Sequence, residues 1–227
     1  MRKYKLNEKF FDTIDTEEKA YILGFIFADG NVSDSSKDKH YRLRITLKQK
    51  DANILIKIKS SLNFTGEVHH RELKSKQRNV DGYMISELSI SNKYLVNRLY
   101  ELGVVPNKTL VIQYPTIPNH LHRHFIRGFF DGDGSIYKRN DRKNGINFEI
   151  SCASVDFILE LSKVIQKETG VDLVYYTKHN KVPVYVIRVS QTKARLILHW
   201  LYFDSNIYLD RKYIMYKELV APLVSNI

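Results

Sequence analysis

The chain has 227 residues, 43% of them apolar, so it is long enough to bury a core as one or two compact units. Lys and Arg (36) outnumber Asp and Glu (25), and the formal charge of +11 indicates a polyanionic partner such as nucleic acid, with a merely soluble basic surface as the alternative. A single cysteine, Cys152, excludes an internal disulfide and fits a reducing compartment. The basic start of the chain is followed by no apolar signal core, and no apolar run is long enough to cross a bilayer, which predicts a soluble, unsecreted protein.

The first predicted element is a helix that starts at residues 15–18, with Asp15 as its cap and Glu18 reaching back to support it. It ends at Gly30, and polar residues follow. Residues 41–48 then alternate with a period of two, which predicts a strand with an apolar core face and a basic outer face. Such a face suits a sheet that lies in a DNA groove, whereas a solvated strand is the alternative.

Asp51 is predicted to cap a second helix that runs from Ala52 to about residue 62 and is ended by Thr65 and Gly66. A hairpin follows, formed by residues 67–73 and 83–90, and its basic tip is a candidate for phosphate contacts. Ser91 is then predicted to cap a helix that runs to residue 102 and is stopped by Gly103.

The second half repeats this order after a stiff connector at residues 114–118. Asn119 begins a helix, and strands are predicted at residues 135–139 and 147–152. Ser154 is predicted to cap a helix that Thr169 and Gly170 end. Strands at residues 173–177 and 184–189 follow, and Ser190 caps a last helix that runs to about residue 202.

Two nonapeptides at residues 22–30 and 126–134 anchor the repeat, because each is the end of an apolar helix that closes with Asp-Gly. Their acids, Asp29 and Asp133, are 104 positions apart, and each lies 37 positions before a glycine that follows a threonine. Small residues recur four apart in both copies, although a glycine inside a helix costs about 1 kcal/mol relative to alanine. We therefore expect the two helices to pack closely along these small residues, which are Gly24, Ala28, Gly128 and Gly132.

The sequence thus predicts an α+β protein of two αββαββα repeats, related by a pseudo-twofold axis through a central helix pair. The predicted boundaries are residues 1–114 for the first repeat, 115–118 for the connector and 119–227 for the second repeat. The two antiparallel sheets are expected to form one saddle that binds DNA, which has a local twofold symmetry of its own. Asp29 and Asp133 should meet in this junction, where their repulsion calls for a cation.

The two motifs resemble the signature of the LAGLIDADG homing endonucleases, and their doubling is similar to the single-chain, two-repeat branch of that family. The resemblance implies a site-specific, metal-dependent double-strand DNA endonuclease that works as a monomer and leaves staggered ends at a long asymmetric target. It also implies that Asp29 and Asp133 bind the metal, together with the backbone carbonyls of Ala28 and Gly132. Mg²⁺ is the expected ion, with Mn²⁺ as a substitute and Ca²⁺ binding without supporting cleavage.

Three further residues are candidates for the cleavage chemistry. Lys108 and Lys212 each lie 79 positions after their aspartate, and the resemblance implies a lysine near the cleavage centre, with a surface lysine as the alternative. Gln49 resembles the family's water-positioning polar residue, and Ser154 is its expected counterpart. Phe27 stands where the second motif has Asp131, to which we assign a supporting or interface role.

The predicted DNA-binding residues lie on the strands and at the hairpin tips, where the polar side chains can reach bases and phosphates. His120, His122 and His124 are not predicted to bind metal, because a spacing of two suits neither one helix face nor zinc. The predicted set consists of Ser33, Lys37, Lys39, Arg42, Arg44, Thr46, Lys48, His69, Arg71, Lys74, Lys76, Arg78, Tyr137, Arg139, Lys143, Asn147, Glu149, Ser151, Tyr175, Thr177 and Arg188.

Two other functions fit the same fold. One is an intron RNA maturase, which need not use the aspartates, and the other is a non-catalytic DNA-binding regulator, which the presence of both aspartates disfavours. The chain begins at Met1 without a flanking splicing domain, which favours a free-standing or intron-encoded protein. The expected location is the cytoplasm in a bacterium, archaeon or phage, and otherwise an organelle matrix.

Overall fold

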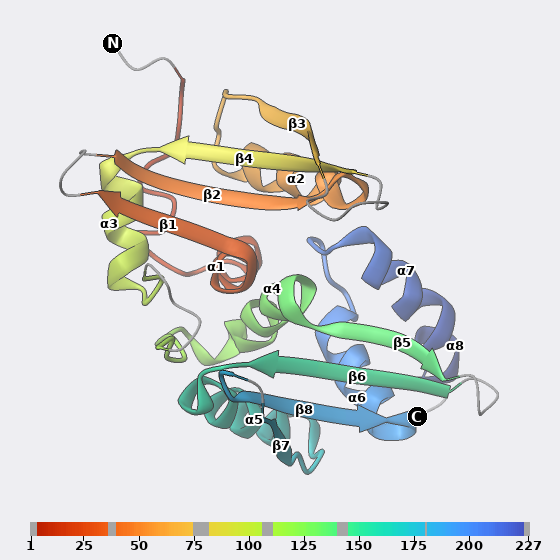
Figure 1. Cartoon of the computed structure of the whole chain (residues 1–227). Coiled ribbons are helices and arrows are strands. Elements are labelled where there is room, and N and C mark those ends of the chain that lie inside the picture. Colours follow the sequence, from red (N-terminus) through yellow and green to blue (C-terminus); the bar gives the residue numbers. More distant parts are fainter. Residues whose placement is uncertain are drawn as a thin grey trace.

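The fold is described from a computed structural model, which defines residues 4–35, 40–74, 82–105, 111–139, 145–179 and 181–224. Two halves of the same architecture meet at a central pair of helices, α1 and α4, with one sheet above and one below that pair in the view of Figure 1. The first half contains α1 (Glu17–Asp29), β1 (Gly30–Ser35), β2 (His40–Lys48), the 3-10 turn η1 (Gln49–Asp51), α2 (Ala52–Ser61), β3 (Val68–Leu73), β4 (Tyr83–Ser91) and α3 (Lys93–Glu101).

The second half repeats the order and adds two C-terminal helices. It contains the turn η3 (Asn119–Leu121), α4 (His122–Asp133), β5 (Ser135–Arg139), β6 (Gly145–Cys152), α5 (Val155–Thr169), β7 (Tyr175–Lys178), β8 (Val184–Ser190), α6 (Gln191–Tyr202), α7 (Asp210–Leu219) and α8 (Ala221–Val224). The predicted α+β class and the doubled element order are therefore confirmed. The helices α7 and α8 and the strand β1 were not recognised in the sequence as individual elements.

Each half forms a four-stranded antiparallel sheet with equivalent topology, β1-β2-β4-β3 in the first and β5-β6-β8-β7 in the second. Helices cover one face of each sheet, and inward side chains such as Leu43, Ile45, Phe148 and Ile150 are buried in one continuous core. The other face of each sheet remains open, because alternate residues of a strand point to opposite sides. Most of the predicted DNA-binding residues on the described strands lie on these open faces.

Four predicted helix caps differ from the structure. Thr16, rather than Asp15, caps α1 by accepting a hydrogen bond from the Lys19 amide at 3.3 Å. Asn92, rather than Ser91, caps α3 by accepting from the Leu95 amide at 2.8 Å. In both cases the predicted residue lies one position too early, since either neighbour can accept such a bond and only the backbone conformation decides between them.

The third difference concerns Ser190, which stands at the N-cap of α6 without making a side-chain cap bond. The fourth concerns Asp51, which stands at the N-cap of α2 and makes no such bond either. Its carboxylate instead accepts from Arg211 Nε, at 3.0 and 3.1 Å. The α2 helix also ends earlier than predicted, at Ser61, because Asn63 takes a left-handed conformation (φ 47°). At the end of α5, Gly170 takes this conformation as predicted, with φ 67°.

Candidate nuclease centre and DNA-binding surface

The central helices touch through the small residues that the sequence singled out. A Cβ atom added to Gly24 would lie 2.0 Å from the Phe125 carbonyl oxygen, and one added to Gly128 would lie 2.0 Å from the Tyr21 carbonyl oxygen. These reciprocal contacts are what a pseudo-twofold axis between α1 and α4 requires. One turn further on, a Cβ at Gly132 would lie 2.3 Å from Ala28 Cβ. All four small residues of the predicted helix interface lie in this contact.

This packing brings the two acidic helix ends together. Asp29 and Asp133 are the last residues of α1 and α4, and the following glycines turn each chain directly into a strand. The Asp29 Oδ2 atom would lie 3.1 Å from a Cβ at Gly132, so the first acid reaches the residue beside the second. Asp29 is half-buried and Asp133 is exposed, so both carboxylates lie where a ligand on the open side can meet them.

A hollow of about 220 Å³ adjoins the second acid, lined among others by Ala28, Asp133, Ser151 and Cys152. The possible metal ligands that the two motifs offer here are carboxylate and backbone carbonyl oxygens, which suit Mg²⁺ and similar hard cations. Within the described ranges, no cluster of three or more His, Cys, Asp and Glu side chains could hold a metal ion. A metal at this junction would therefore take its remaining ligands from water and from a bound phosphate.

Gln49 and its expected counterpart differ in setting. Gln49 begins the 3-10 turn at the end of β2 and is exposed. Ser154 is buried; its hydroxyl donates to the Ile112 carbonyl at 2.6 Å and accepts from the Phe157 amide at 3.4 Å. Ser154 is thus a helix cap and does not repeat the exposure of Gln49.

Lys212 lies by the second motif, but its setting differs from the prediction. The side chain is fully buried, and its ammonium donates to the carbonyls of Phe130, Asp131 (3.0 Å) and Gly134 (2.6 Å). Burial lowers the pKa of Lys212 to about 8, against the opposing influence of the Asp131 carboxylate. Because three carbonyls take its three N–H groups, Lys212 holds the end of α4. Lys108 lies outside the described residues.

Asp131, which has no acidic counterpart in the first motif, is the centre of a buried polar network at the junction. Its Oδ2 accepts from the Tyr21 hydroxyl at 2.7 Å and from the Leu209 amide at 2.8 Å, and its Oδ1 accepts from the Tyr202 hydroxyl at 2.5 Å. Burial raises the pKa of Asp131, although the Lys212 ammonium and the hydrogen bonds oppose the change. Tyr21 belongs to the first repeat, so the predicted interface role of Asp131 is confirmed.

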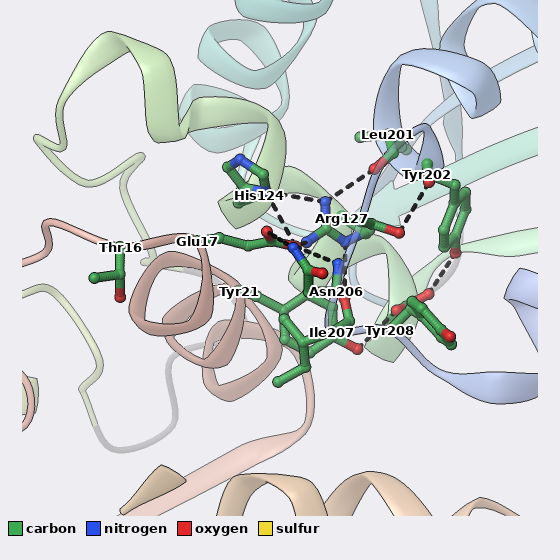
Figure 2. A network of polar contacts seen from close by, with 12 residues as sticks. Thr16, Glu17, Tyr21, His124, Arg127, Leu201, Tyr202, Asn206, Ile207 and Tyr208 are labelled. Atoms are coloured by element: carbon green, nitrogen blue, oxygen red, sulfur yellow. Dashed lines mark hydrogen bonds and ion pairs between the residues drawn. The ribbon is translucent and has the colours of Figure 1, made fainter.

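Arg127 forms the neighbouring part of this network, which Figure 2 shows between α1, α4 and the segment after α6. Its guanidinium is fully buried and binds Glu17 at 2.7 Å and the Leu201 carbonyl at 2.9 Å. His124 Nδ1 lies 3.1 Å from Arg127, and burial, followed by that cation, lowers the pKa of His124 to about 4. Neutral His124 therefore serves as a partner for Arg127.

The open face of the first sheet gathers the predicted basic residues. Strand register pairs Ser33 with Arg42, and Arg44 is the next residue of β2 on the same face. Thr46 pairs with Glu87, and Glu87 pairs in turn with His69 on β3. Arg44 and Arg71 are 45% and 56% exposed, which leaves their guanidinium groups available to DNA. All predicted residues on the described strands of this sheet share this face, namely Ser33, Arg42, Arg44, Thr46, Lys48, His69 and Arg71.

The second sheet corrects one part of the prediction. Tyr137, Asn147, Glu149, Ser151 and Arg188 share the open face, as expected from their pairing. Tyr175 and Thr177 do not.

These two residues pair with Ile187 and Tyr185 on the covered side, where the Tyr175 ring meets the Tyr185 ring at 5.7 Å. The open face of β7 instead carries Tyr176 and Lys178, which the sequence analysis missed. Adjacent tyrosines on a short edge strand give no alternation to show which one faces the core.

A carboxylate sits among the cations on each open face. Glu149 accepts from Arg188 Nε at 2.5 Å and from Lys178 Nζ at 3.3 Å. Partial burial acts to raise the pKa of Glu149, but these hydrogen bonds outweigh it and hold the pKa below its ordinary value. Glu87 lies 3.5 Å from Arg44 and 3.8 Å from Arg71 on the first sheet. These acids hold the cationic side chains over the sheets.

Several predicted DNA contacts cannot be placed. Lys37, Lys39, Lys76, Arg78 and Lys143 lie outside the described residues, as does the side chain of Arg139. Lys74 follows β3 and is exposed. No helix in the part of the chain that the structure covers is long and apolar enough to span a membrane.

Two family comparisons match the two repeats separately. Residues 120–199 match the LAGLIDADG-like domain, and residues 18–88 match the WhiA LAGLIDADG-like domain. Each match includes one of the acidic helix ends. Together with the doubled αββαββα architecture, they show that the chain belongs to the LAGLIDADG family.

The fold is also that of solved LAGLIDADG structures. The homing endonuclease I-WcaI, bound to its DNA recognition sequence, is similar with a TM-score of 0.60 and 15% identity over 88% of this chain and 87% of that chain. I-DmoI in complex with DNA and Ca has a TM-score of 0.57 and 17% identity over 89% and 97% of the two chains. At this level of identity the likeness defines the fold and leaves the activity to be argued from the site.

One curated relative is an uncharacterized protein of Methanocaldococcus jannaschii, 29% identical over 166 residues. That alignment covers 72% of this chain and 52% of the relative, so the match spans about half the length of the curated protein.

Proposed function

We propose that this protein is a site-specific DNA endonuclease that hydrolyses both strands of a duplex with divalent metal ions. The observation that carries the proposal is the meeting of Asp29 and Asp133 at the junction of two open sheet faces. The net charge of +11 supports a polyanionic substrate. The I-DmoI structures with DNA and Ca or Mn support divalent-metal use in this fold.

In the proposed complex, the duplex lies along both open faces, and the acidic helix ends meet the backbone at its centre. Asp29 and Asp133, with the carbonyls of Ala28 and Gly132, would hold the ions, Mg²⁺ being the expected one. Such ions activate water and neutralise charge on the phosphate and the leaving oxygen. Gln49 would orient the water, and Lys212 would hold the end of α4 in place. Staggered ends and a single-chain monomer as the working unit complete the proposal.

The two sheets would read different half-sites. The first presents Arg42, Arg44 and Arg71, which suit bidentate contacts with guanine. The second presents Tyr137, Tyr176 and an acid held between two cations, which suits a different set of bases. Asn147 is on the same face, but its side chain is buried. We therefore infer an asymmetric target. A division into residues 1–114 and 119–227, joined by 115–118, fits the two sheets and remains part of the proposal.

The decisive experiment combines wild-type protein and Mg²⁺ with a duplex DNA library of randomised inserts, from which cut molecules are recovered and sequenced. Asp29→Asn should reduce cleavage of the selected duplex by at least about a hundredfold, because it removes a metal-ligand charge. Its affinity for the same duplex in Ca²⁺ should stay within about threefold.

Glu160→Gln, which removes an exposed acid that pairs with Lys163 on α5, is the matched control and should cut like wild type. Loss of binding in Asp29→Asn would mean that the aspartate is structural. If the wild type yields no cut molecules, the nuclease assignment is overturned. If the protein instead protects an intron RNA, a maturase is favoured.

A further inference from the structure

The segment that leaves α6 lies between the two repeats and contacts both (Figure 2). On the first-repeat side, the backbone and side-chain amides of Asn206 donate to the Glu17 carboxylate at 2.8 and 2.9 Å. On the second-repeat side, Arg127 Nε donates to the Ile207 carbonyl at 3.0 Å, and the Leu209 amide donates to Asp131 at 2.8 Å. The segment therefore enters α7 already fixed to α1 and α4.

The first turn of α7 then reaches across to the first repeat. Asp210 accepts from Lys57 Nζ at 2.7 Å and from Asn53 Nδ2 at 2.5 Å, both on α2. Arg211 Nε contacts both carboxylate oxygens of Asp51, at 3.0 and 3.1 Å. Figure 1 shows α7 beside the junction, next to the start of α2. Since Asp51 ends the 3-10 turn that Gln49 begins, α7 is tied to the turn that carries Gln49.

The next residue of α7 faces the other repeat. Lys212 donates to the carbonyls of Phe130, Asp131 and Gly134, which lie on both sides of Asp133. Adjacent residues of one helical turn thus hold the Gln49 turn of the first repeat and the acidic helix end of the second. We call Asp210, Arg211 and Lys212 the clasp.

We propose that the clasp fixes the position of Gln49 relative to Asp133, and that Arg211 is a positioning residue for the cleavage of one DNA strand. Neither η1 nor α2 has a side-chain cap bond of its own, and the Asp51 carboxylate that stands at that cap is engaged by Arg211. Arg211 is 46% exposed, so its ion pair contributes little to stability. The orientation of a reacting group, by contrast, is sensitive to small displacements. This inference rests on the proposed nuclease function.

The test compares Arg211→Gln with wild type on the selected duplex, each strand carrying its own end label. Single-turnover cutting of one strand should slow by at least about tenfold, the other strand should be cut at close to the wild-type rate, and nicked duplex should accumulate. Affinity for the duplex in Ca²⁺ should stay within about twofold. Arg211→Lys, which keeps the cation, should restore part of the rate.

Gln49→Ala should slow the same strand, and adding Arg211→Gln to it should slow that strand no further, because both changes act through one group. Lys163→Gln, which breaks an exposed ion pair with Glu160 on α5, is the matched control and should cut both strands normally. If wild type cuts the duplex and Arg211→Gln cuts both strands at wild-type rates or slows both equally, the inference fails while the nuclease function stands. If wild type cuts no duplex, both fail.

Discussion

At the scale of single residues, the buried carboxylate of Asp131 explains why the two motifs cannot be exact copies. Its carboxylate takes hydrogen bonds from both repeats, whereas Phe27, at the corresponding position of the first motif, packs its ring against Phe125 at 5.2 Å. A second buried acid here would need three donors of its own, since a buried carboxylate is costly unless it is fully paired. One position of the symmetric pair is therefore polar and the other apolar.

Asp131→Asn should lower the free energy of unfolding by about 2 to 4 kcal/mol, because the amide places an N–H group against donors that Asp131 now satisfies. Urea denaturation followed by circular dichroism would measure the change. Glu218→Gln, an exposed acid on α7, should change it by less than about 0.5 kcal/mol. Equal stability of the two variants would contradict the role given to the network.

At the scale of elements, the contact between α1 and α4 decides how closely the acidic ends can approach. The helices meet backbone to backbone at Gly24 and Gly128, which only a residue without a side chain allows. The element that follows each helix is a strand, which begins at Gly30 in the first repeat and at Ser135 in the second, without a loop. The acids are therefore held by two rigid elements on either side, as a preorganised site requires.

Gly128→Ala should destabilise the protein by at least about 3 kcal/mol or prevent folding, because the new Cβ would lie 2.0 Å from a backbone oxygen of the partner helix. In an isolated helix the same change would stabilise by about 1 kcal/mol. Gly170→Ala is the comparison, since nothing lies within 4 Å of its Cβ and only its φ of 67° is unfavourable. It should cost about 1 kcal/mol. Thermal unfolding would measure the loss of stability in both variants. A loss in Gly128→Ala as small as that in Gly170→Ala would contradict the close packing of α1 and α4.

At the scale of the whole molecule, two similar sheets present different chemistry along one line. The first open face is dominated by arginines and the second by tyrosines and the Glu149 cluster. A single chain that carries both halves can hold unequal surfaces in a fixed order, which an exact dimer of one repeat cannot do. The clasp adds a further inequality, because it joins the C-terminal segment to the first repeat.

Binding of the selected duplex should weaken by about 10³- to 10⁵-fold between 50 and 200 mM salt, if six to ten phosphates are neutralised. Fluorescence anisotropy in Ca²⁺ would give the slope. Asp29→Asn should show the same slope as wild type, since it changes no phosphate-binding cation. Affinity that is indifferent to salt would contradict the electrostatic part of the proposed function.

The sequence by itself determined the doubled fold, the acidic pair, the helix interface and the basic face of β2. These are local signals: apolar periodicity, glycine spacing and strand alternation survive in any single stretch of chain. The tertiary structure alone decided that Asp51 pairs with Arg211 and does not cap its own helix. It also decided that Tyr176 takes the open face in place of Tyr175, and that Lys212 is buried under Asp133. In each of these cases neighbouring residues or competing partners have similar local preferences. The choice between them depends on groups that are distant in sequence and meet only after the two repeats have packed together.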